Sequence, residues 1–77
     1  MAEQAGRASG RSVIRALERL GWRVHRIRGS HHIMRHPEFP RTTLSIPVHG
    51  NQTIPVGTLM GILRDAQVDA ERFNELV

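Results

Sequence analysis

The chain has 77 residues and no cysteine, which allows one compact domain and excludes a disulfide framework or a large enzyme with its own cofactor domain. No window approaches the roughly 18 apolar residues of a membrane span, and no signal-peptide pattern is present, so we expect a cytoplasmic protein. All eleven basic residues are arginine; residues 1–50 hold nine of them against three acidic residues, a formal charge of +6, whereas residues 51–77 carry −2. A strongly basic half is typical of a protein that binds nucleic acid, although arginines that only solubilise a small domain would look the same.

The first part of the chain predicts a short lead-in and a helix. Residues 1–11 are small and polar without an apolar period, which indicates a flexible N-terminal segment and a single domain over 12–77. Ser12 is a plausible N-cap for a helix whose apolar positions recur at helical spacing, and Gly21 supplies the left-handed residue that ends it.

Three strands are predicted next. From Trp22 the period changes to two, with Trp22 and Val24 on one face and Arg23, His25 and Ile27 on the other. Residues 28–30 form a tight turn, residues 31–36 a second strand, and residues 42–48 a third, half-buried one.

Two helices complete the predicted fold. Pro55 suits the first turn of a helix whose apolar stripe is Leu59, Ile62, Leu63 and Ala66, and Asp69 caps a short C-terminal helix that can bury Phe73. The sequence therefore predicts an α+β fold with the order helix, three-stranded antiparallel sheet, helix, short helix. Two helices on one face of such a sheet resemble the double-stranded-RNA-binding fold, which leaves the other face free for a ligand.

All five histidines fall within residues 25–49. A histidine can give or take a proton near neutral pH, which is what cleavage of RNA by its own 2′-hydroxyl requires. His31 follows Gly29 and Ser30 directly, at a turn where a phosphate can reach it and backbone N–H groups can approach that phosphate. Each exposed histidine, taken alone, is more often an ordinary surface residue.

Rival interpretations of the same residues are weaker. His32 and His36 have metal-ligand spacing only on a helix; on a strand they are about 13 Å apart, and the adjacent His31 and His32 face opposite ways. Trp22 and Phe39 could stack on bases; core packing is favoured for Trp22, while RNA contact and packing over the core edge remain equally open for Phe39.

Several short motifs, in this order, resemble the HicA (YcfA-like) toxins of bacterial toxin–antitoxin systems. They are Leu20-Gly21-Trp22, Arg28-Gly29-Ser30-His31-His32-Ile33, His36-Pro37, Ile46-Pro47-Val48-His49, residues 54–59 and residues 62–66. The resemblance covers about residues 12–68. Three features depart from the family pattern: Met34 stands where an aromatic residue is frequent, Gln67 replaces a glycine after a helix, and arginine replaces lysine throughout.

The resemblance implies a metal-independent mRNA endonuclease of double-stranded-RNA-binding-like fold, without a small-molecule cofactor, that arrests growth and is held inactive by a HicB-type antitoxin. In the family's Gly-Ser-His motif the histidine is catalytic, which corresponds to His31 here, with His32 as second choice. We expect the RNA to contact Gly29, Ser30, His32, Arg26, Arg28 and Arg35. Two alternatives are a non-catalytic RNA-binding module and a protein that acts mainly by forming a complex with its antitoxin.

Overall fold

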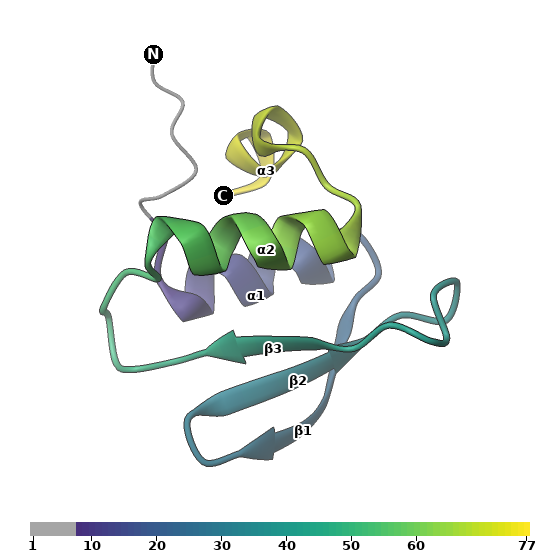
Figure 1. Cartoon of the computed structure of the whole chain (residues 1–77), viewed down its shortest axis with the longest axis horizontal. Helices are drawn as coiled ribbons and strands as arrows, with labels where there is room; N and C mark the ends of the chain where they lie inside the picture. Colours follow the sequence, from purple (N-terminus) through teal and green to yellow (C-terminus); the bar gives the residue numbers. More distant parts are fainter. Residues whose placement is uncertain (1–7) are drawn as a thin grey trace.

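The computed structural model describes residues 8–77 and consists of a three-stranded sheet covered on one face by helices (Figure 1). The sheet is antiparallel with the strand order β1-β2-β3. The helices α1 and α2 lie over the sheet, and α3 packs against α2 on the side away from it. The elements are α1 (Gly10–Glu18), β1 (Arg23–Arg28), β2 (His31–Arg35), β3 (Leu44–Pro47), α2 (Val56–Ala66) and α3 (Ala70–Leu76). The predicted α+β order is thus confirmed.

The first helix begins earlier than predicted. Its N-cap is Ser9, whose Oγ accepts a hydrogen bond from the Ser12 backbone N–H at 3.2 Å, so the prediction of Ser12 as the cap was wrong. Residues 8–11, which we assigned to a flexible segment, belong to the fold: Ala8 is buried and its carbonyl accepts from the Ile54 N–H at 2.8 Å. The rest of that predicted segment, residues 1–7, lies outside the described residues.

A β-bulge at His25 changes which side chains of β1 share a face. Val24 pairs with Met34 and Arg26 pairs with Ile33, so His25 is an extra residue on β1. Because a bulge shifts the alternation by one position, Ile27 lies on the same face as Val24, not with Arg23 as predicted. The bulge therefore leaves the arginines of β1 together on the face without helices.

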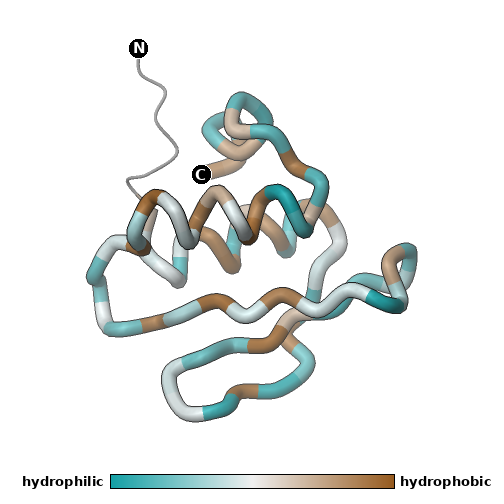
Figure 2. The backbone as a smooth tube through the Cα atoms, viewed as in Figure 1, coloured by the Kyte–Doolittle hydropathy of each residue, from teal (hydrophilic) through white to brown (hydrophobic). Residues whose placement is uncertain are grey.

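The core lies between the sheet and the helices. Met34, Leu44 and Ile46 point from β2 and β3 toward the helices and are at most 2% exposed. The alternation of apolar and polar residues along β3 is visible in Figure 2. The helices contribute the apolar stripes that the sequence predicts, and most of their predicted members are buried: Val13, Ile14, Ala16 and Leu17 on α1, and Leu59, Ile62, Leu63 and Ala66 on α2. Leu20, also predicted for the first helix, lies beyond its end at Glu18 and is only partly buried. Burial of this apolar surface is the main stabilising contribution to a domain of this size.

An aromatic cluster closes one end of the core. Trp22 is 1% exposed, stacks on Phe39 with 5.8 Å between ring centroids, and meets the edge of His36 at 5.1 Å. His36 Nδ1 accepts from the Glu38 N–H at 3.0 Å, which leaves Nε2 to donate to the Leu20 carbonyl at 2.9 Å. Core packing of Trp22 is confirmed, and Phe39 packs over the core edge.

The C-terminal helices are joined through a left-handed residue. Gln67 adopts φ 62°, a left-handed conformation that favours glycine, as the C-cap of α2. Asp69 then caps α3 as predicted, because its carboxylate accepts from the Arg72 N–H at 2.8 Å, and Phe73 is buried.

Candidate functional site

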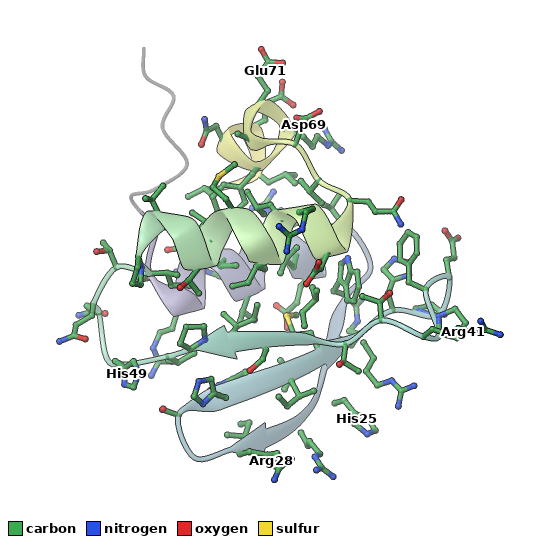
Figure 3. The ribbon with its side chains drawn as sticks, in the orientation of Figure 1. His25, Arg28, Arg41, His49, Asp69 and Glu71 are labelled. Carbon is green, nitrogen blue, oxygen red and sulfur yellow. The ribbon has the colours of Figure 1, made fainter. Side chains whose placement is uncertain are left out.

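An open hollow of about 430 Å³ lies where β2 begins, β3 ends and α2 begins. The loop between β3 and α2 forms much of its wall, and this loop carries His49 in Figure 3. Two histidines reach the hollow from different parts of the chain. The lining residues are His31, Pro47, His49, Gln52, Thr53, Ile54, Pro55 and Thr58.

The β1–β2 turn places His31 at the rim of this hollow. Gly29 and Ser30 form the turn, and His31 is the first residue of β2, opposite Arg28 on β1 and Pro47 on β3. The Ser30 carbonyl accepts from the Val48 N–H at 2.7 Å, which ties the turn to the end of β3. His31 is therefore an exposed side chain on a backbone that is paired on both sides.

The three arginines predicted to bind phosphate lie on the sheet face without helices. Arg26, Arg28 and Arg35 line a shallow second hollow of about 310 Å³ beside His25 at the bulge. Within residues 8–77, Arg26 and Arg28 have no hydrogen-bond or ion-pair partner, whereas the Nη2 of Arg35 donates to the Pro40 carbonyl at 3.3 Å. Arg26 and Arg28 are therefore free to bind an anion, and Arg28 is the one next to His31.

His32 does not lie with these residues. It stands opposite Ile27 and Ile46, on the helix-covered face of the sheet, as the alternation of a strand requires. Its side chain is half-buried, and its Nδ1 is buried without a hydrogen-bond partner in the described part of the chain. The structure thus brings together His31, Arg28 and the Gly29–Ser30 turn and separates His32 from them.

His49 is a member of the site that was not predicted from the sequence. The loop that follows the third strand carries it, and its place next to His31 depends on the register of β3 against β2. The sequence signal that could have found it is the spacing Pro47-Val48-His49: once Pro47 is paired with His31, His49 follows two residues later on the same side.

The first turn of α2 adds a favourable environment for an anion. Pro55 is the N-cap of α2 and provides no side-chain hydrogen bond to the helix. The first turn of α2 contains no acidic residue. The leading N–H groups of a helix carry a partial positive charge, so this end of the hollow attracts phosphate oxygens.

Comparison with known proteins identifies the family. Residues 10–68 match the family model described as HicA toxin of bacterial toxin-antitoxin systems. The chain belongs to the HicA family. A search of curated proteins found no match. The HicA match extends from the start of α1 to just beyond α2, and it contains every residue that lines the hollow around His31.

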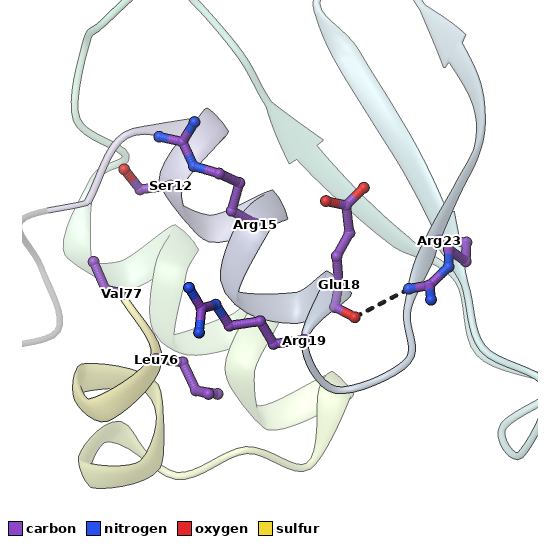
Figure 4. Close-up of a pocket in the computed structure, with 7 residues that line it drawn as sticks. All are labelled: Ser12, Arg15, Glu18, Arg19, Arg23, Leu76 and Val77. Carbon is purple, nitrogen blue, oxygen red and sulfur yellow. Dashed lines mark hydrogen bonds between the residues drawn. The ribbon is translucent and has the colours of Figure 1, made fainter.

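A different hollow in this HicA protein lies on the outer side of α1 and has another chemical character. It has a volume of about 470 Å³ and lies between α1, Arg23 and the end of α3. Figure 4 shows Arg15 on α1, Arg19 at its C-cap, and Arg23, whose Nη1 donates to the Glu18 carbonyl at 3.0 Å. No histidine lines it, so it offers charge but no group suited to proton transfer near neutral pH.

Residues 8–77 contain neither a candidate metal site nor a membrane-spanning helix. No group of three or more His, Cys, Asp or Glu side chains in this part of the chain is arranged to hold a metal ion. None of its helices combines the length and the apolar character needed to cross a membrane.

Proposed function

We propose that this HicA toxin is a ribonuclease that cleaves mRNA, with His31 as a catalytic residue. The observation that carries the proposal is the position of His31: an exposed imidazole, fixed between two paired strands, at the rim of a hollow and opposite Arg28. Cleavage by the 2′-hydroxyl needs a group that moves a proton and a cation that stabilises charge on the phosphate, and this pair supplies both.

The RNA path follows the basic, helix-free face of the sheet. Arg26 and Arg28 hold the phosphates that flank the scissile bond, and Arg35 extends the same surface toward the far end of β2. Gly29 in the turn is exposed and has no side chain, so an RNA backbone can approach His31 over it. Since phosphate contacts give affinity without sequence information, this surface positions the RNA and leaves the choice of sequence to other contacts.

The partner expected from the family is an antitoxin of the HicB type. An antitoxin that covers the hollow around His31 would block RNA entry, and an acidic surface on it would complement the free arginines of β1. Growth arrest follows from loss of mRNA when the antitoxin is absent.

Expression from a tightly controlled promoter tests this function. Wild type, His31→Ala and the surface variant Arg64→Ala are induced in parallel, and growth and mRNA integrity are followed together. Arrest with mRNA loss in the wild type and Arg64→Ala, but not in His31→Ala, is the expected result. Equal arrest by all three proteins would contradict the proposal and favour a non-catalytic RNA-binding module.

A further inference from the structure

We infer that His49 is the second proton-transfer group of this site and works as a pair with His31. The inference rests on the proposed ribonuclease function and names the partner group that a single histidine lacks. One histidine can act as base or as acid in a given step, but cleavage of RNA needs both. His31 and His49 are the two histidines that line the hollow, one from the start of β2 and the other from the loop that follows β3.

The strand register brings the two side chains close to one phosphodiester. His31 pairs with Pro47, and the 2.7 Å hydrogen bond from the Val48 N–H to the Ser30 carbonyl continues the pairing beyond the sheet. His49 is the next residue after Val48. Diagonal neighbours of this kind in an antiparallel pair have Cα atoms about 7–8 Å apart, a separation that long and aromatic side chains span.

The hollow offers the two imidazoles no competitor for proton transfer. Its remaining described lining consists of proline, glutamine, threonine and isoleucine side chains, without a carboxylate. Arg28 on β1 is paired with His31, and its guanidinium does not give up a proton near neutral pH. His32, the alternative from the sequence, lies on the other face of the sheet.

The reaction balances with these two groups alone. One imidazole takes the proton of the 2′-hydroxyl while the 2′-oxygen forms a bond to phosphorus. The bond from phosphorus to the 5′-oxygen breaks, and the other imidazole, in its protonated form, gives its proton to that oxygen. The products are a 2′,3′-cyclic phosphate and a free 5′-hydroxyl, and the pair of histidines has exchanged its protonation states.

The test compares two substrates. RNA that the wild type cleaves is mapped, and a short oligonucleotide of that site is made with the ordinary 5′-oxygen or with sulfur in its place. A thiolate leaves without being protonated, so sulfur removes the need for the acid but not for the base. The proteins are wild type, His31→Ala, His49→Ala and His49→Gln, with Asn51→Ala as the control from the same exposed loop.

On the ordinary substrate, we expect His49→Ala and His49→Gln to lose about 10²–10⁴-fold in cleavage rate, with RNA affinity within about threefold of the wild type. On the sulfur substrate, one of the two alanine variants recovers and the other does not, which shows which histidine is the acid.

Two different failures are distinguishable. Absence of RNA cleavage by the wild type would refute the ribonuclease function itself, and full cleavage by His31→Ala would refute the catalytic role of His31. If His31→Ala is inactive while His49→Ala cleaves within about threefold of Asn51→Ala, the function stands and the pairing is wrong. Loss of activity in both variants without recovery of either on the sulfur substrate would also overturn the pairing. Circular dichroism confirms that each variant is folded.

Discussion

Gly21, between α1 and β1, is a position where a single added methyl group should be costly. Its φ is +100°, and a Cβ built there comes within 2.6 Å of His36 Nε2. Alanine in this backbone region costs about 1–2 kcal/mol. The imidazole must also move, which weakens its 2.9 Å hydrogen bond to the Leu20 carbonyl and its edge contact with Trp22, each about 0.5–1.5 kcal/mol.

Gly21→Ala should therefore lower the free energy of unfolding by about 2–4 kcal/mol, which for a domain of this size lowers Tm by about 10–30 °C. Gly50→Ala is the matched control, because Gly50 also has positive φ (+58°) but no heavy atom within 4 Å of the added Cβ. Its expected loss is about 1 kcal/mol. Urea and thermal unfolding followed by circular dichroism measure both. Equal losses in the two variants would refute the claim that contact with His36 makes Gly21 necessary.

Three further predictions concern the core, the basic face and the aromatic cluster. Met34→Ala, at a position with no exposed surface, should cost about 2–5 kcal/mol in urea unfolding; a loss below about 1 kcal/mol would mean that the core is not packed around this side chain. Arg28→Ala should weaken RNA binding and reduce the slope of log affinity against log salt by about 1, whereas Arg64→Ala, on an exposed part of α2, should change neither. Phe39→Ala should lower Tm through loss of its stack on Trp22 while RNA affinity is unchanged, and a fall in affinity at constant stability would show that Phe39 contacts RNA instead.

The sequence predicts the fold well because the apolar residues of the helices and strands recur with clear periods and because capping residues mark the ends of helices. The stripe on α2 and the cap at Asp69 are both local patterns, and both are confirmed. Two predictions were wrong: the N-cap of α1 and the face of the sheet on which Ile27 lies. Ser9 and Ser12 both suit an N-cap, and the tertiary contacts of the preceding segment, which include the hydrogen bond from the Ile54 N–H to the Ala8 carbonyl, favour the first. The bulge at His25 has no marker in the sequence, so the face of Ile27 was assigned wrongly.

The site is less predictable because it is assembled from distant segments. His31 follows a recognisable turn and could be named from a short motif. His49 could not, because the segment between the second and third strands contains two prolines and does not fix the register of one strand against the other. The adjacent pair His31 and His32 looks like one unit in the sequence, yet the pleat of the strand puts the two side chains on opposite faces.

The most direct test of the account uses purified wild type and His31→Ala with the same RNA. Cleavage, the chemical nature of the new ends and binding affinity are measured on each protein. The account predicts that the wild type produces 2′,3′-cyclic phosphate ends and that His31→Ala binds the RNA with similar affinity but cleaves at least about 10²-fold more slowly. Cleavage by His31→Ala at the rate of the wild type would contradict it.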